Sequence, residues 1–266
     1  MDSQNDSPPY RYILGMRVDI TNYQDAARKI VGWAKLERSC YICAANVHMI
    51  MTAYDRAEFA RIVNQAVLVT PDGMPLVLAL NGLGAKESSR VYGPDLTLSV
   101  CQAAAMAEIK VAFYGGTSQS LKLLTKFLRQ RFPGIKIVCQ ISPPFRPLTS
   151  EEDDAYTKQI VESEAKILFT GIGCPKQELW MAAHKGRIPA VMIGVGATFD
   201  FFSGRVRQAP CWMQELCLEW LFRLIMEPKR LWRRYAYNNP RFVLLFTKQW
   251  LIHYLSNKWF KMNSAD

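Results

Sequence analysis

The sequence lacks any long uncharged apolar run. An apolar stretch of about 18 residues, the length that predicts a membrane-spanning helix, does not occur. The first twelve residues, MDSQNDSPPYRY, are polar and acidic, so we expect no signal peptide. These two absences argue against an integral membrane protein and against a secreted one.

The sequence also lacks a disulfide framework and a metal-binding pattern. Its seven cysteines are odd in number and irregularly spaced, which favours a reduced, cytosolic compartment. Cys40 and Cys43 lie in the apolar run CYICAA, and we interpret them as packing residues because no second cysteine pair completes a zinc site. His48 and His184 have no second histidine or carboxylate at ligand spacing, so we assign no metal.

A third absence is the dinucleotide fingerprint. Neither GIGCPK (171–176) nor GVGATF (194–199) is G-x-G-x-x-G, and neither opens the first strand–helix–strand unit with an acidic residue about 20 positions later. This argues against an oxidoreductase that uses nicotinamide or flavin, which is one rival function. We expect no cofactor.

Strand and helix patterns alternate through the first two hundred residues. Apolar, β-branched runs are typical of strands at 11–15, 40–45, 66–70, 110–115, 136–141, 166–171 and 190–196. Helical patterns cover 22–36, 55–65, 96–107, 118–131 and 151–163, with Thr117 or Ser118 and Thr149 or Ser150 as candidate caps. Fully apolar strands between helices predict an α/β, Rossmann-like fold with a mainly parallel sheet and helices on both faces.

The chain changes character near Gly204, and we predict a core at 1–204 and a helical appendage at 205–266. Residues 205–262 contain eleven Lys and Arg against three Asp and Glu, and so account for most of the net charge of +10. Trp, Phe and Leu are interleaved with these cations, which is typical of helices in a membrane interface. The alternative structure for this tail is a pair of helices that pack on the core. An alternative function is that of a nonenzymatic protein that binds a membrane or RNA through this tail.

Polar residues follow several expected strands, where open parallel sheets bind ligands. Asn46 and His48 follow one strand, and Asp72-Gly73 follows the next. Glycine-rich segments at 115–116, 171–178 and 194–200 follow three others, which suggests a nucleotide-type ligand. Taken alone, Asp72 is interpreted as the aspartate of an Asp-Gly turn. In RVYGPDL, Arg90 and Asp95 either pair with each other or hold a polar ligand.

Several segments, in order, resemble one family. They are ANVHM (45–49), TPDGMPLV (70–77), RVYGPDL (90–96), GIGCPKQE (171–178), GVGATFDFFSG (194–204) and LEWLFRLIMEPKRLWRRY (218–235). Over residues 12–236 the chain resembles the WecG/TagA/CpsF family of bacterial glycosyltransferases. The resemblance implies a metal-independent, inverting enzyme that moves a sugar from a UDP donor to a sugar on polyprenyl diphosphate. It also implies a peripheral protein at the cytoplasmic face of the bacterial inner membrane, active in surface polysaccharide or exopolysaccharide biosynthesis.

The resemblance also implies roles for single residues. Asp72 matches the proposed general base, which takes the proton of the acceptor hydroxyl as that oxygen attacks the anomeric carbon. Asn46, Arg90 and Gln177 match residues that orient the donor. The other substrate-binding candidates lie in the same polar segments: Gly73, Asp95, Gly173, Glu178 and Asp200. The family's threonine two positions before the asparagine is Ala44 here, so the donor sugar of the teichoic-acid members is not implied.

Three arginines match the basic positions of the family's C-terminal appendage, where they neutralise the departing diphosphate: Arg223, Arg230 and Arg233. Their spacing places them near one face if a single helix runs through them, and Pro228 is the residue that can end such a helix. The expected partners are a UDP-sugar, the polyprenyl-linked acceptor and an anionic membrane surface, and not nucleic acid. The tryptophan-rich tail is equally suited to forming a homo-oligomer.

Overall fold

The main sheet has six parallel strands. The computed structural model describes residues 8–263, with side chains to residue 256; the N-terminal segment 1–7, on which the signal-peptide expectation depends, lies outside this range. The strands are β3 (Cys40–Ala45), β4 (Leu68–Pro71), β5 (Lys110–Gly115), β6 (Lys136–Ile141), β7 (Ile167–Gly171) and β8 (Val191–Gly194). Their order across the sheet is β4-β3-β8-β7-β5-β6. The predicted Rossmann-like α/β fold with a parallel sheet is therefore confirmed.

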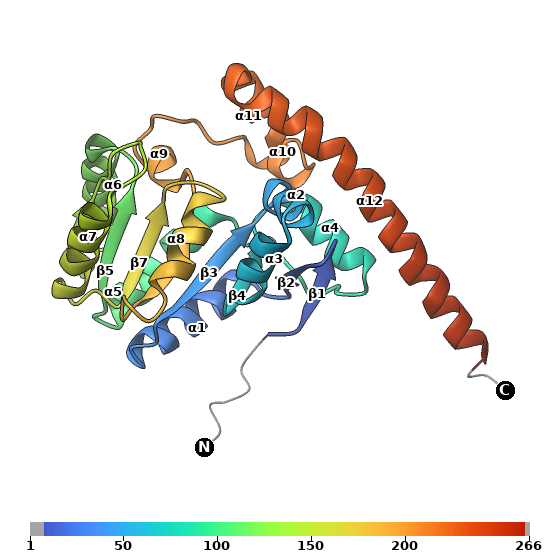
Figure 1. Ribbon diagram of the computed structural model, residues 1–266, viewed down its shortest axis with the longest axis horizontal. Coiled ribbons are helices and arrows are strands. Elements are labelled where there is room, and N and C mark those ends of the chain that lie inside the picture. The colour runs from blue at the N-terminus through green and yellow to red at the C-terminus, as the bar shows by residue number, and fades with distance from the viewer. Residues whose placement is uncertain (1–7, 264–266) are drawn as a thin grey trace.

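Helices cover both faces of this sheet (Figure 1). One face carries α1 (Tyr23–Lys35), α5 (Gly93–Met106), α6 (Ser118–Arg131) and α9 (Thr198–Phe202). The other carries α2 (Val47–Asp55), α3 (Ala57–Asn64), α4 (Met74–Gly82), α7 (Ser150–Glu162) and α8 (Lys176–His184). Thr117 and Thr149, rather than the serines after them, cap α6 and α7.

The two faces explain the C-x-x-C pair. Successive residues of a strand point to opposite faces. Cys43 therefore lies in the core beneath α2 and α8, whereas Cys40 lies in the core beneath α1 and α5. Both thiols are buried and face away from each other, so their packing role is confirmed.

A hairpin that the sequence patterns did not predict precedes the sheet. β1 (Tyr10–Ile13) pairs antiparallel with β2 (Met16–Asp19). The connection is the two-residue turn Leu14-Gly15, with φ of 49° and 85°, which is the left-handed backbone that two-residue hairpins require. β2 is joined to the sheet through Asp19, whose Oδ2 accepts a hydrogen bond from the Val69 nitrogen at 2.6 Å.

The connections diverge at the centre of the sheet. β3 and β8 are neighbours, but the helix that follows β3 packs on one face and the helix that follows β8 packs on the other. Open α/β sheets bind ligands in the crevice that such a switch in direction creates, outside the carboxyl ends of the strands. The fold thus places a candidate site beyond β3, β4 and β8.

The rest of the chain consists of α10 (Cys211–Glu215), α11 (Glu219–Met226) and α12 (Pro228–Asn263). In Figure 1, α12 is the long helix along one side of the sheet domain. The chain breaks at Glu227, whose φ of −136° and ψ of 56° are not helical, and Pro228 begins the new helix. Arg223 therefore lies on a different helix from Arg230 and Arg233, and the single-face arrangement does not form. By contrast, α12 runs unbroken through Pro240.

Contacts with the core hold α12 in place. Arg241 forms a bidentate ion pair with Asp55 of α2, at 2.6 and 3.0 Å. Gln249 accepts a hydrogen bond from the Leu14 nitrogen at 2.9 Å and donates to the Tyr12 carbonyl at 2.7 Å. Phe242 is buried in the core beneath α2. None of the helices in the described part of the chain is long and apolar enough to cross a membrane.

Candidate active site

Neighbouring strand ends bring Asn46 and Asp72 together. β3 and β4 are in register with Ala45 opposite Pro71, and the Asp72 nitrogen donates to the Ala45 carbonyl at 2.8 Å. Asn46 caps α2, its Oδ1 accepting from the Met49 nitrogen at 3.2 Å. A Cβ on Gly73 would lie 3.8 Å from the Asn46 Cβ. Asn46, Asp72 and Gly73 therefore form one corner of the crevice.

Asp72 is partly buried and its carboxylate is fixed in direction. Its Oδ1 accepts a hydrogen bond from the Gly93 nitrogen at 2.6 Å, at the start of α5. Burial raises the pKa of Asp72 to about 6; the nearby Glu219 also raises it, whereas Arg90, the Gly93 N–H and Arg223 lower it. A carboxylate with a pKa near neutrality is a stronger base than an ordinary aspartate and is still ionised at pH 7.

Arg90 links the Asp72 turn to the appendage. Its Nε donates to the Asp72 carbonyl at 2.6 Å, and its Nη1 donates to Gln214 Oε1 at 2.6 Å. Its Nη2 forms an ion pair with Glu219. All three guanidinium nitrogens thus have protein partners, and the plane stacks 4.1 Å from the centre of the Tyr92 ring. A direct contact between Arg90 and the donor stays a prediction.

Asp95 is not the partner of Arg90. It lies in the first turn of α5, and its Oδ2 accepts a hydrogen bond from the Tyr23 hydroxyl at 3.3 Å. The Tyr23 hydroxyl also accepts from the Tyr92 nitrogen at 3.0 Å, beside the Asp72 corner. Asp95 is therefore connected to this corner through Tyr23, and the pairing alternative for the RVYGPDL segment is wrong.

The P-K-Q-E segment braces the loops after β7 and β8. Gln177 donates to Glu178 Oε1 at 2.7 Å and accepts from the Gly196 nitrogen at 3.1 Å. Both side chains are almost fully buried, and burial raises the pKa of Glu178 to about 7. A Cβ on Gly194 would lie 2.9 Å from the Gln177 amide nitrogen, so a larger residue there would displace this side chain. Contacts of Gln177 or Glu178 with a substrate stay predictions.

Gly173 and Asp200 occupy different surroundings. Gly173 has a φ of 86°, and a Cβ there would meet nothing within 4 Å, so its backbone borders open space. Asp200 instead accepts a hydrogen bond from Ser120 Oγ at 2.9 Å and lies 3.7 Å from Arg205. This arrangement ties α9 to the start of α6, and no described contact joins Asp200 to Asp72.

The appendage arginines divide into two groups. Arg223 lies close enough to Asp72 to lower its pKa, and its guanidinium is 5.9 Å from the centre of the Phe201 ring. The buried Arg223 Nε has no hydrogen-bond partner among the described residues. Arg230 pairs with Glu227, one residue before α12. Arg233, by contrast, is exposed and stacks 5.4 Å from the centre of the Trp232 ring.

Arg234 is the residue that sequence reasoning missed. Burial lowers its pKa, and Arg223 and Arg230 lower it further, so these three cations are neighbours. His48 lies on the same side: its Nδ1 is 3.2 Å from Asn238 Nδ2, and burial together with Arg234 lowers its pKa to about 4. His48 is therefore neutral at pH 7 and connects α2 to α12.

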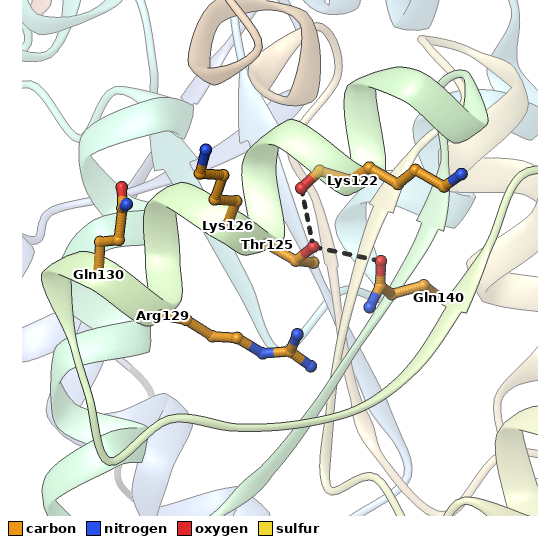
Figure 2. Close-up of a pocket in the computed structure, with 6 residues that line it drawn as sticks. All are labelled: Lys122, Thr125, Lys126, Arg129, Gln130 and Gln140. Atoms are coloured by element: carbon orange, nitrogen blue, oxygen red, sulfur yellow. Dashed lines mark hydrogen bonds between the residues drawn. The ribbon is translucent and has the colours of Figure 1, made fainter.

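A hollow away from the Asp72 corner lies at the opposite edge of the sheet, beside β6 (Figure 2). Its lining residues lie on α6 and β6: Lys122, Thr125, Lys126, Arg129, Gln130 and Gln140. Thr125 Oγ1 bridges the Lys122 carbonyl and Gln140 Oε1, at 3.2 and 3.4 Å. None of the predicted site residues lines it, so we place the candidate site at the Asp72 corner.

The described residues contain no group of three or more His, Cys, Asp or Glu side chains that is arranged to hold a metal ion. The resemblance alone carries the expectation of a metal-independent reaction. In the site itself, the positive charge beside Asp72 comes from Arg90 and Arg223. Arg223 and Arg230 also act on Arg234.

Comparisons with known proteins agree with this geometry. Residues 11–256 match the model of the family described as "Glycosyl transferase WecG/TagA/CpsF family". An N-acetylglucosaminyldiphosphoundecaprenol N-acetyl-beta-D-mannosaminyltransferase from Bacillus spizizenii is 28% identical over 219 residues, which are 79% of this chain and 80% of that protein. The enzyme of the same name from Staphylococcus aureus strain MW2 is 28% identical over 224 residues, 83% of this chain and 86% of the relative. The chain therefore belongs to the WecG/TagA/CpsF family of glycosyltransferases.

Proposed function

We propose that this glycosyltransferase is an inverting enzyme that transfers a sugar from a UDP-sugar to a sugar carried on polyprenyl diphosphate. The observation that supports it best is the setting of Asp72. The carboxylate is held by the Gly93 N–H, has a pKa of about 6 and lies beside Arg223 at the crevice of a parallel sheet. A base and a cation at one point are what an inverting displacement on a nucleotide sugar requires.

In this proposal Asp72 removes the proton of the acceptor hydroxyl while that oxygen attacks the anomeric carbon. The bond to the donor diphosphate breaks, and the leaving UDP carries the electron pair away. Arg223 and Arg230 balance its charge together with Arg234, whose pKa these two arginines lower. Asn46 and Gly73 border the same corner and suit the positioning of the donor sugar. No metal is assigned a step.

The relatives' names suggest the substrates. These proteins are named for N-acetylmannosaminyl transfer to N-acetylglucosaminyldiphosphoundecaprenol. We propose an acceptor of the same class, an amino sugar on a polyprenyl diphosphate. The donor is a UDP-hexose derivative whose sugar is set in part by Ala44, which stands where the family has a threonine.

The proposed location is the inner face of the bacterial cytoplasmic membrane, with residues 205–266 as the membrane-associating appendage. The described sequence of α12 contains no Asp or Glu, and its exposed side chains include Trp232, Tyr237 and Leu244. Apolar and aromatic side chains among cations are typical of helices that lie in an anionic interface.

The decisive experiment measures UDP release from a panel of UDP-sugars, with synthetic polyprenyl-diphosphate N-acetylglucosamine as acceptor. We expect release that depends on the acceptor and falls by roughly 10²–10⁴-fold in Asp72→Asn, because general-base catalysis is worth about that much. Donor binding should be unchanged in the variant. Turnover that survives in Asp72→Asn would remove this residue from the mechanism, and no turnover with any donor would leave only a binding function.

A further inference from the structure

Glu178 is a fully buried carboxylate to which the proposed mechanism gives no step. Its Oε1 accepts a hydrogen bond from Gln177 Nε2 at 2.7 Å, whereas Oε2 has no hydrogen-bond partner among the described residues. The nearby titratable groups are the thiols of Cys43 and Cys174, which are weak donors. Burial raises the pKa of Glu178 to about 7, so the fold loses stability as the pH rises toward that value. A carboxylate kept in such surroundings is a candidate for a functional role.

Glu178 fixes the orientation of the Gln177 amide. The two ends of an amide side chain have nearly the same shape, so its hydrogen bonds decide which end is the oxygen. The Gly196 nitrogen is a donor and meets Gln177 Oε1 at 3.1 Å. The Gln177 nitrogen must then donate, and Glu178 Oε1 is its acceptor. The two contacts together hold the amide in one orientation.

Gln177 in turn holds the segment after β8, which we call the 194–198 turn. The Gly196 nitrogen that it binds belongs to a residue with a φ of 58°, in the left-handed region. Thr198 closes the turn, because its Oγ1 donates to the Val195 carbonyl at 2.7 Å. Rotation of the Gln177 amide would therefore release the Gly196 N–H and loosen the backbone of this turn.

The 194–198 turn contacts the residue that orients the base. A Cβ on Gly93 would lie 3.4 Å from both the Val195 carbonyl oxygen and Thr198 Oγ1. The same Cβ would lie 3.5 Å from Asp72 Oδ1, so the turn and the carboxylate lie on one side of Gly93. The Gly93 nitrogen donates to Asp72 Oδ1 at 2.6 Å, and this hydrogen bond lowers the pKa of Asp72. A displaced turn would therefore alter the contact that orients the carboxylate.

The geometry points to Glu178 as a positioning residue for the base, an assignment that rests on the function proposed above. Glu178 acts through Gln177 and the 194–198 turn and contacts neither substrate. Its carboxylate holds the amide, the amide holds the turn, and the turn keeps the Gly93 N–H on Asp72. The result is a base whose carboxylate is held in the direction from which it receives the acceptor's proton.

The test removes the acceptor oxygen at position 178 and follows the ionisation of Asp72. Glu178→Met keeps the length of the side chain but offers Gln177 no acceptor. A weaker contact between the Gly93 N–H and Asp72 should raise the pKa of Asp72 above its value of about 6. The acid limb of the kcat/KM profile should then move to higher pH by about 0.5–1, and kcat should fall roughly tenfold.

The direction of this change identifies its cause. Removal of a negative charge favours the ionised form of any neighbouring carboxylate and would move the acid limb to lower pH. Glu178→Gln removes the charge but keeps an oxygen that can accept from Gln177, so the limb should not move to higher pH. Only loss of the hydrogen-bonded connection between Glu178 and Asp72 should raise the limb.

Two further variants test the route. Thr198→Val removes the hydroxyl that closes the 194–198 turn and should move the acid limb to higher pH, as Glu178→Met does. Met181→Leu is the matched control on α8. A Cβ on Gly194 would lie 2.9 Å from Met181 Cε, so this substitution changes the packing beneath the turn and removes no hydrogen bond. It should leave the limb in place.

An acid limb that stays in place or moves to lower pH in both Glu178→Met and Thr198→Val would overturn the assignment. An equal rise in Met181→Leu would overturn it as well, because packing alone would then explain the effect. A raised KM for the UDP-sugar with an unmoved limb would make Glu178 a substrate contact instead of a positioning residue.

Titration without substrate separates this assignment from the proposed function. Carbon NMR on the full-length protein gives the pKa of the Asp72 carboxyl, whose signal is identified by its loss in Asp72→Asn. If no UDP-sugar supports transfer, the proposed function fails, while the NMR titration of Glu178→Met still reports on the positioning of Asp72. If transfer depends on Asp72 but Glu178→Met leaves its pKa unchanged, the positioning role fails while the proposed function stands.

Discussion

At the scale of single residues, the feature that distinguishes Asp72 is the charge around it. Its pKa of about 6 results first from burial and then from Glu219, while Arg90, the Gly93 N–H and Arg223 act in the opposite direction. A base is active when it is ionised, so kcat/KM should rise with pH up to about 6 and then level off.

Glu219→Gln removes one of the two causes that raise the pKa of Asp72. The acid limb of the kcat/KM profile should therefore move to lower pH. The maximal kcat/KM at higher pH should fall if loss of the Arg90–Glu219 ion pair also displaces Arg90. Steady-state rates between pH 4.5 and 8 would show the shift, at pH values chosen around the pKa of about 6. Glu215→Gln, which removes the same charge from an exposed position four residues earlier, should leave the limb in place.

An unmoved acid limb in Glu219→Gln would mean that another group controls it. A limb that moves equally in both variants would point to the net charge of the appendage rather than to the contact with Arg90.

The sequence predicted the Asp72 corner because polar residues after parallel strands must meet at one edge of the sheet. It did not predict Arg234. The break at Glu227 resets the rotational phase of the helix, so offsets counted from Arg223 no longer tell which of two adjacent arginines faces the site. Adjacent positions differ by about 100° around a helix, enough to turn Arg233 outward.

At the scale of elements, the turns after β5 and β7 are constrained by close backbone packing. A Cβ on Gly115 would lie 2.5 Å from the Gly171 carbonyl carbon and oxygen, and its φ is 123°. A Cβ on Gly171 would lie 2.7 Å from the Phe199 ring. These glycines are needed for packing, whereas Gly173 borders open space with a similar left-handed backbone.

Gly115→Ala should therefore destabilise the fold by more than about 3 kcal/mol, because both a clash with backbone atoms and a left-handed alanine are involved. Gly173→Ala keeps only the second cost and should lose roughly 1–2 kcal/mol. Denaturant unfolding of the two variants gives the comparison. Similar losses in both would show that the contact with Gly171 relaxes easily.

Two of the elements that sequence patterns missed lack a recognisable pattern, each for its own reason. α4 reads MPLVLALNG and is apolar around most of its circumference, so it has no polar face by which to recognise a helix. β2 is four residues long and lies outside the main sheet. The main strands were predictable because all except the edge strand β6 are buried on both faces. The helices that were predicted carry one apolar side.

At the scale of the whole molecule, charge and apolar exposure coincide on α12. The core nearly balances its charges, whereas residues 205–262 carry eleven cations against three acids. One side of α12 docks on the core through Asp55 and Phe242, and the opposite side exposes Leu244 and Leu251. Docking on the core and contact with a membrane are therefore compatible uses of one helix.

Leu244→Glu and Leu251→Glu should each abolish most binding to anionic vesicles, because a carboxylate replaces an apolar side chain in a negatively charged interface. Thermal stability should change little at these exposed positions. Phe145→Glu, at a residue that is 86% exposed on the core, makes the same change away from α12 and should leave vesicle binding intact. Co-sedimentation would contradict this prediction if all three variants lost binding equally.

The contacts of Arg90 with the Asp72 turn and with Glu219 have a thermodynamic consequence for the molecule. One guanidinium holds both the Asp72 turn and Glu219, and the presence of Glu219 raises the affinity of Asp72 for a proton. Coupling between two equilibria is reciprocal. A proton on Asp72 must therefore favour the nearby position of Glu219, whereas an ionised Asp72 must favour the nearby position of Arg223. Both residues belong to α11, so ionisation of the base shifts the hold on this helix from its carboxylate to its guanidinium.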